Sequence, residues 1–183
     1  MSEAPEFQKF PKVSRWSREV VVTEKIDGTN GQIHVMEDGA VFAGSRSQYL
    51  LPFQNDNFGF GRWVHEHSEE LRALGPGRHF GEWWGQGIQR SYGLKEKRFS
   101  LFNVGRWNAE TPPPACCGTV PVLYKGPNVQ AEIERCLEAL AFGGSAAAPG
   151  FTKPEGIVIF HTAANMCFKK TIEKDAEPKS KPA

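Results

Sequence analysis

The chain has 183 residues, 39% of them hydrophobic and 23% charged, and a formal net charge of +1 at pH 7. This composition is typical of one globular domain with its own core, and it excludes a binder that depends on a high overall positive charge, so any nucleic-acid surface must be a local patch. No apolar run approaches the roughly 20 residues of a membrane span, and residues 1–11 have no apolar signal-peptide core, so we expect a cytoplasmic protein without membrane contact.

The first predicted element is a buried strand at residues 19–24, a short run rich in β-branched side chains. Further strands are expected at residues 32–36, 40–43, 79–83, 99–104, 120–124, 156–160 and 166–172. Apolar residues at helical spacing predict one helix over residues 60–74, and a second one from an Asn128 cap to Leu140.

Residues 143–150 (GGSAAAPG) are interpreted as a flexible connection. Short antiparallel strand units with two helices between them predict an α+β protein. We expect one domain over residues 1–172, followed by a polar, charged tail at residues 173–183.

Neither the cysteines nor the histidines follow the spacing of a zinc site, so we expect no histidine ligand. Cys116 and Cys117 are adjacent, and with Cys136 and Cys167 they are interpreted as inert thiols of a reducing compartment.

Lys25 stands where the first predicted strand meets a turn marked by Asp27 and Gly28. A strand end followed by glycine presents a side chain at a cleft mouth and lets a ligand approach the backbone. A lysine amine is nucleophilic only when deprotonated, roughly one part in a thousand at neutral pH, so burial or a neighbouring cation would have to activate it. Taken alone, Lys-x-Asp-Gly favours an ordinary surface lysine.

Five further stretches, in a fixed order along the chain, change this interpretation. They are Arg46 after Ala43-Gly44-Ser45, Glu82 within Phe80-Gly81-Glu82-Trp83, Phe102 on a predicted strand, Glu155-Gly156-Ile157-Val158, and Phe168-Lys169. Together with Lys25-Ile26-Asp27-Gly28 they resemble the six ordered motifs of the covalent nucleotidyltransferases, which comprise polynucleotide ligases and mRNA-capping enzymes.

Within that superfamily, residues 23–30 (TEKIDGTN) and 80–85 (FGEWWG) resemble nick-sealing RNA ligases. Asp27 is the usual residue of DNA ligases and capping enzymes, so an ATP-dependent DNA ligase stays an alternative, and a GTP-using capping enzyme is a weaker one. A non-catalytic nucleotide- or nucleic-acid-binding module is a further alternative. The joint presence of Lys25, Glu82, Glu155 and Lys169 argues against it.

The resemblance implies an antiparallel-sheet nucleotidyltransferase domain, an ATP-grasp-like ligase core. Such enzymes usually continue into a second domain, but the few polar residues after Lys170 lead us to expect no C-terminal OB or helical domain here. It implies an ATP-dependent RNA ligase in which Lys25 attacks the α-phosphate of ATP, forms lysyl-AMP, adenylates a nucleic-acid 5′-end and enables phosphodiester formation. The expected partner is nucleic acid (RNA, a nicked duplex, or DNA). Because few residues follow Lys170, we expect either a minimal ligase that clamps nucleic acid poorly or one that needs a partner protein to supply a clamp domain.

The resemblance also assigns the nucleotide pocket. Its expected members are Thr23, Glu24, Asn30, Arg46, Glu82, Phe102, Glu155 and Lys169. Phe102 would stack on adenine, Glu82 would accept a ribose hydroxyl, and Glu155 would hold Mg²⁺ or Mn²⁺.

Charged and polar side chains would meet the phosphates. Lys169 would stabilise the α-phosphate, while Asn30 and Arg46 would contact nucleotide or nucleic-acid phosphates. Adjacent strand residues face opposite sides, so only one of Lys169 and Lys170 can face the pocket. The resemblance, through Phe168 and Thr171, assigns Lys169 to it. Lys170 and Arg90 are expected to contact nucleic acid. Glu24 would act at the adenine edge through its backbone.

Overall fold

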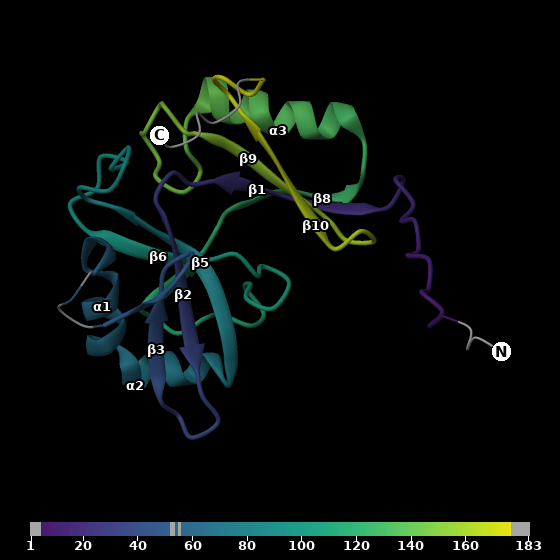
Figure 1. The fold of residues 1–183 in the computed structure, drawn as a ribbon. Coiled ribbons are helices and arrows are strands. Elements are labelled where there is room, and N and C mark those ends of the chain that lie inside the picture. The colour runs from purple at the N-terminus through teal and green to yellow at the C-terminus, as the bar shows by residue number, and fades with distance from the viewer. Residues whose placement is uncertain (1–4, 52–53, 55, 177–183) are drawn as a thin grey trace, which may run out of the picture.

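The strands of this computed structural model, which describes residues 5–51, 54 and 56–176, form two sheets (Figure 1). The four-stranded sheet is antiparallel, with the order β10-β9-β1-β8. Its members are β1 (Glu19–Lys25), β8 (Val122–Pro127), β9 (Gly156–His161) and β10 (Met166–Thr171). Strand β1, from the N-terminal part of the chain, therefore lies between β8 and β9, which come from its C-terminal third.

The second sheet has six strands in the order β4-β3-β2-β5-β6-β7, and only the β6–β7 pair is parallel. Its members are β2 (Thr29–Val35), β3 (Val41–Gly44), β4 (Tyr49–Leu50), β5 (Gly77–Gly85), β6 (Lys97–Leu101) and β7 (Cys117–Thr119). The predicted hairpin at residues 32–43 is confirmed as β2 and β3, joined through a turn with Gly39 at positive φ.

The predicted helix over residues 60–74 is present but interrupted. It divides into α1 (Phe60–Glu66), α2 (Ser68–Leu71) and a final 3₁₀ turn, η2 (Arg72–Leu74), preceded by the 3₁₀ turn η1 (Asn57–Gly59). The interruption is at His67, whose φ of −103° and ψ of 15° are not helical. Phe60, Val64, Leu71 and Leu74 still face one core, so the apolar spacing predicted the buried face correctly.

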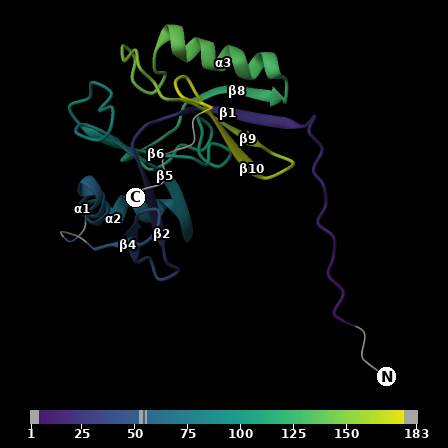
Figure 2. The ribbon, with the colours of Figure 1, turned by 45° about the horizontal axis from the view of Figure 1, so that its top comes forward.

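Helix α3 (Gln130–Gly143) lies over the four-stranded sheet (Figure 2). Its buried Ile133, Cys136 and Leu140 pack on Val20 and Val22 of β1. The expected Asn128 cap is wrong: the residue before the helix is Val129, and the side-chain amide of Asn128 donates to the Trp16 carbonyl instead. The α+β prediction is confirmed, and no helix in the described part of the chain is long and apolar enough to cross a bilayer.

Candidate active site

A cleft of about 1270 Å³ is lined by residues of both sheets. The four-stranded sheet contributes β1, β8, β9 and β10, and the six-stranded sheet contributes β2, β5 and the segment after β6. The volume exceeds the upper end of the range of roughly 300–1,000 Å³ found for small-molecule sites, so the cleft can hold a nucleotide with room for a second ligand.

Lys25 and Glu155 meet at the wall of this cleft. Lys25 ends β1 and pairs with Gly156, the first residue of β9, so the strand register brings Glu155 beside it. The Lys25 Nζ lies 2.5 Å from Oε2 of Glu155, and the two side chains are only 21% and 14% exposed. The ion pair thus holds a lysine amine, a group that can act as a nucleophile once it is deprotonated, at the wall of the cleft.

Glu82 fixes the turn that follows Lys25. Its Oε1 accepts a hydrogen bond from the Gly28 N–H at 3.0 Å, and its Oε2 lies 3.5 Å from the Asn30 side-chain amide. A Cβ at Gly28 would lie 2.5 Å from the Trp83 carbonyl oxygen, so no larger residue fits there without displacing the backbone. Burial raises the pKa of the Glu82 carboxyl from 4.5 to about 7, against the lowering effect of the Lys25 charge.

Asp27 turns toward a different set of partners. Its Oδ2 accepts a hydrogen bond from Arg90 Nε at 2.8 Å, and its N–H donates to the Tyr92 hydroxyl at 2.8 Å. Arg90 also donates to the Lys153 carbonyl at 2.9 Å, close to Glu155 in sequence. Arg90 therefore braces the two segments that carry Lys25 and Glu155, and its expected contact with nucleic acid stays a prediction.

Glu24 lines the cleft, but its carboxylate is turned to the segment after α3, because it follows Thr23 on a strand whose side chains alternate. The carboxylate is buried and accepts hydrogen bonds from the Ser145 hydroxyl at 2.6 Å and the Ala147 N–H at 2.8 Å. The segment 143–150 is thus tied to β1, contrary to its interpretation as a flexible connection. A role for the Glu24 backbone at the adenine edge stays a prediction.

The other expected pocket residues also line the cleft. They are Thr23, Asn30, Arg46, Phe102 and Lys169. Phe102 is 40% exposed there, so its ring is accessible for stacking on a ligand. Lys170 does not line the cleft; it lies on the other face of β10, where the neighbouring Ile172 packs toward α3. The geometry thus supports the assignment of Lys169 and does not support Lys170 as a contact beside this cleft.

Sequence reasoning missed Phe80. Its ring is 53% exposed and lines the cleft, two residues before Glu82 on β5. Alternation along the strand, which puts residues 80 and 82 on the same face, was the signal that could have found it. Phe80 and Phe102 are therefore two exposed aromatic rings in one cleft.

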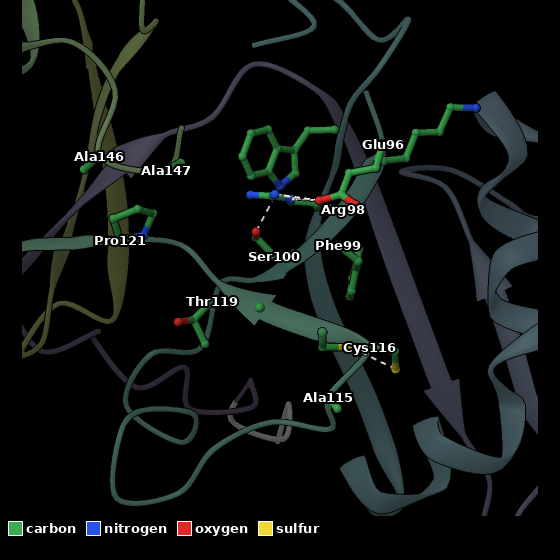
Figure 3. A pocket seen from close by; sticks show the side chains of 14 residues that line it. Glu96, Arg98, Phe99, Ser100, Ala115, Cys116, Thr119, Pro121, Ala146 and Ala147 are labelled. Carbon is green, nitrogen blue, oxygen red and sulfur yellow. Dashed lines mark hydrogen bonds and ion pairs between the residues drawn. The ribbon is translucent and has the colours of Figure 1, made fainter. Parts of the chain in front are cut away.

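A second, smaller cavity of about 520 Å³ lies beside β6 and β7 (Figure 3). The Trp84 indole N–H donates to the Ser100 hydroxyl there, and Arg98 pairs with Glu96. None of the expected site residues lines this cavity. The described residues contain no cluster of three His, Cys, Asp or Glu side chains that could hold a metal.

The sequence profile of the RNA ligase family matches residues 18–174, which include every residue of the cleft named above. No curated protein matches the chain significantly.

Solved structures of an RNA ligase from Naegleria gruberi have a similar fold. A variant of that ligase with AMP and Mn has a TM-score of 0.63 at 21% sequence identity, over 85% of this chain and 50% of the other. A second variant with ATP and Mn has a TM-score of 0.62 at 22% identity over the same shares, and the ligase with PPi has one of 0.61 at 22% identity, again over 85% and 50%. The present chain spans about half the length of these ligases.

Proposed function

Because the chain belongs to the RNA ligase family, we propose that it is an ATP-dependent RNA ligase that works through AMP bound covalently to Lys25. The observation that carries the proposal is the position of the Lys25 Nζ, at the wall of the cleft and 2.5 Å from the Glu155 carboxylate.

The first step joins AMP to the protein. The Lys25 Nζ loses a proton and attacks the α-phosphorus of ATP; a P–N bond forms, the bond to the β-phosphate oxygen breaks, and pyrophosphate leaves. A 5′-phosphate oxygen of RNA then attacks the same phosphorus, which breaks the P–N bond and frees Lys25. Finally a 3′-hydroxyl attacks the adenylated 5′-phosphate, and AMP leaves as the phosphodiester forms.

Glu155 has to release Lys25 before the amine can attack. Its carboxylate is also suited to Mg²⁺ or Mn²⁺, since hard cations take oxygen ligands and magnesium is usually held by one or two carboxylates with substrate phosphates. A cation bound there would neutralise phosphate charge. Glu155 would thus exchange its ion pair with Lys25 for the cation when the nucleotide binds.

Lys169 and the aromatic rings would hold the nucleotide itself. Lys169 lies on the cleft face of β10 and would neutralise charge that builds on the α-phosphate. Phe102 would stack on the adenine, and Glu82, which already fixes Gly28, would meet a ribose hydroxyl. Arg46 and Asn30 would contact phosphates from the β2–β3 side of the cleft.

Two assays test the proposal together. With radiolabelled nucleotide, ATP should label the protein and GTP should not, which separates a ligase from a capping enzyme. With matched nicked duplexes, one with RNA and one with DNA at the nick, RNA should be joined faster. Faster joining of DNA would replace the proposal by the DNA ligase alternative, and failure to label with either nucleotide would refute covalent catalysis.

A further inference from the structure

Residues 7–18 repeat a three-residue pattern four times: an apolar residue, a small or polar one, and a basic one. The apolar positions are Phe7, Phe10, Val13 and Trp16, and the basic positions are Lys9, Lys12, Arg15 and Arg18. Glu6 is the only acidic residue between positions 5 and 18, so this segment has a formal charge of +3. Since the whole chain carries +1, all other residues together carry −2.

A period of three has a structural meaning. A polyproline-type extended chain has three residues per turn, so it would place the apolar side chains along one edge and the basic ones along another. Pro11 suits that conformation. An α-helix would distribute the four apolar positions over half of its circumference, and a strand would alternate them between two faces.

The segment forms an arm that leaves the body of the protein. Residues 5–18 belong to no helix or strand, and both views show them leading away from the start of β1 (Figures 1 and 2). Phe7, Phe10 and Val13 are 89%, 80% and 87% exposed. Several large apolar side chains exposed to solvent in one segment indicate an interaction site.

The base of the arm is fixed to the body. The Trp16 carbonyl lies 2.8 Å from His161 Nε2 and accepts a hydrogen bond from the Asn128 side chain at 3.1 Å, and the Trp16 and His161 rings stack at 5.9 Å. The Ser14 hydroxyl donates to the Ala163 carbonyl at 3.1 Å, in the β9–β10 turn. Within the described part of the chain, no hydrogen bond involves residues 5–13.

The fixed base lies at the far end of the catalytic cleft. Residues Glu19, Val21, Thr23 and Lys25 of β1 all line the cleft. Six residue steps of about 3.3 Å separate the two ends of this row, roughly 20 Å. A stacked strand that advances about 3.4 Å per nucleotide would cover that distance in about six nucleotides, and an unstacked single strand would need fewer, so a strand whose end lies at Lys25 can reach the arm.

We propose that residues 5–18 are an RNA-binding arm, which holds the single-stranded part of the substrate next to the cleft; this inference rests on the proposed function. Basic side chains that alternate with aromatic rings combine the two interactions that bind single strands, neutralisation of phosphates and stacking on bases. The rings would lie about 9 Å apart in a polyproline-type chain, which suits an unstacked strand. A polyanion is attracted to this +3 segment, whereas the remainder of the chain is negative overall.

Binding of a fluorescent, 5′-phosphorylated single-stranded RNA, followed by anisotropy over a salt series, tests the arm. The combined variant K9A/K12A/R15A removes three of its four cations, and F7A/F10A removes two rings. The matched control R135A/F142A removes an exposed cation and an exposed ring on α3, away from the cleft. Self-adenylation is measured for every protein, since no arm residue lines the pocket around Lys25.

The charge variant should lower the slope of log K against log salt by about 2, at roughly 0.7 for each phosphate contact on a single strand. The ring variant should bind at least about fivefold more weakly per ring at every salt concentration, with the slope unchanged. The α3 control should bind like the wild type. All of these proteins should be adenylated at the wild-type rate.

The arm is refuted if the wild type is adenylated and both arm variants bind RNA with its affinity and slope. It is equally refuted if only the charge variant weakens binding, since stacking is then absent. If the wild type sediments as a dimer and F7A/F10A sediments as a monomer with unchanged RNA binding, the arm is instead a contact between two copies of the chain. Failure of the wild type to become adenylated refutes the proposed function instead.

Discussion

The buried carboxyl of Glu82 leads to a quantitative prediction about pH. Its pKa is raised from 4.5 to about 7, chiefly by burial. Between these two values the folded protein holds a proton on Glu82 that the unfolded chain has released. The free energy of unfolding should therefore fall as the pH rises from about 4.5 to about 7, and this contribution should be constant outside that interval.

The magnitude follows from the same two values. At about 1.4 kcal/mol per pH unit, a pKa raised from 4.5 to about 7 corresponds to about 3 kcal/mol. This is a large fraction of the roughly 5–15 kcal/mol that stabilises a typical domain. The variant Glu82→Gln lacks the titrating group, so its stability relative to wild type should increase by this amount from acid to neutral pH.

The assay is urea unfolding at a series of pH values, without nucleotide, for the wild type, Glu82→Gln and Glu82→Ala. Alanine also loses the hydrogen bond to the Gly28 N–H. The free energy of unfolding of Glu82→Ala should therefore differ from that of Glu82→Gln by a constant amount. Both variants should show the same pH dependence relative to the wild type. A pH-independent difference between wild type and both variants would show that Glu82 does not titrate with a raised pKa, and would refute the reasoning.

Three further predictions concern the cleft. Glu155→Ala and Lys169→Ala should each slow self-adenylation by about 10²–10³, as measured with labelled ATP, because each removes one preorganised charge at the phosphates; near-normal labelling would mean that the residue was misplaced. Glu24→Gln should lower the free energy of unfolding by about 1–3 kcal/mol, because an amide cannot accept both donors that hold residues 143–150; unchanged urea unfolding would contradict this. Joining of RNA should fail before self-adenylation as salt rises from about 50 to 200 mM, since only joining depends on phosphate contacts outside the pocket; a parallel loss of both activities would refute it.

The order of the motifs predicted which residues lie together in the cleft, because most of the motifs are on or next to strands that pair with each other. Lys25 at the end of β1 and Glu155 before β9 are 130 positions apart, and the register of one antiparallel pair brings them together. Alternation along β10 predicted that only one of Lys169 and Lys170 faces the cleft, and the family resemblance selected Lys169, which lines it. Most strands were predicted to within a few residues, because short apolar runs between turn residues mark them in the sequence.

Loops were predicted less well, because their contacts depend on three-dimensional neighbours. Residues 143–150 have the small residues of a flexible linker, yet the buried Glu24 carboxylate holds Ser145 and Ala147. Arg90 was expected to contact nucleic acid, which stays a prediction, and its ion pair with Asp27 was not foreseen. Neither partner could be identified from local pattern.

The N-terminal arm was missed for a different reason. Residues 5–18 have neither the period of a strand nor that of a helix, and residues 1–11 lack the apolar core of a signal peptide. A period of three was the signal that could have found it. The exposure of Phe7, Phe10 and Val13 then shows that the pattern does not serve the core.

Intact-mass measurement after incubation with ATP and a divalent cation tests the central claim most directly. The wild-type protein should gain the mass of one AMP, and peptide mapping should locate it on Lys25. Lys25→Ala should gain nothing, while K9A/K12A/R15A, which changes cations outside the cleft, should gain AMP like the wild type. Labelling of the Lys25→Ala protein, or AMP on any other residue of the wild type, would contradict the account.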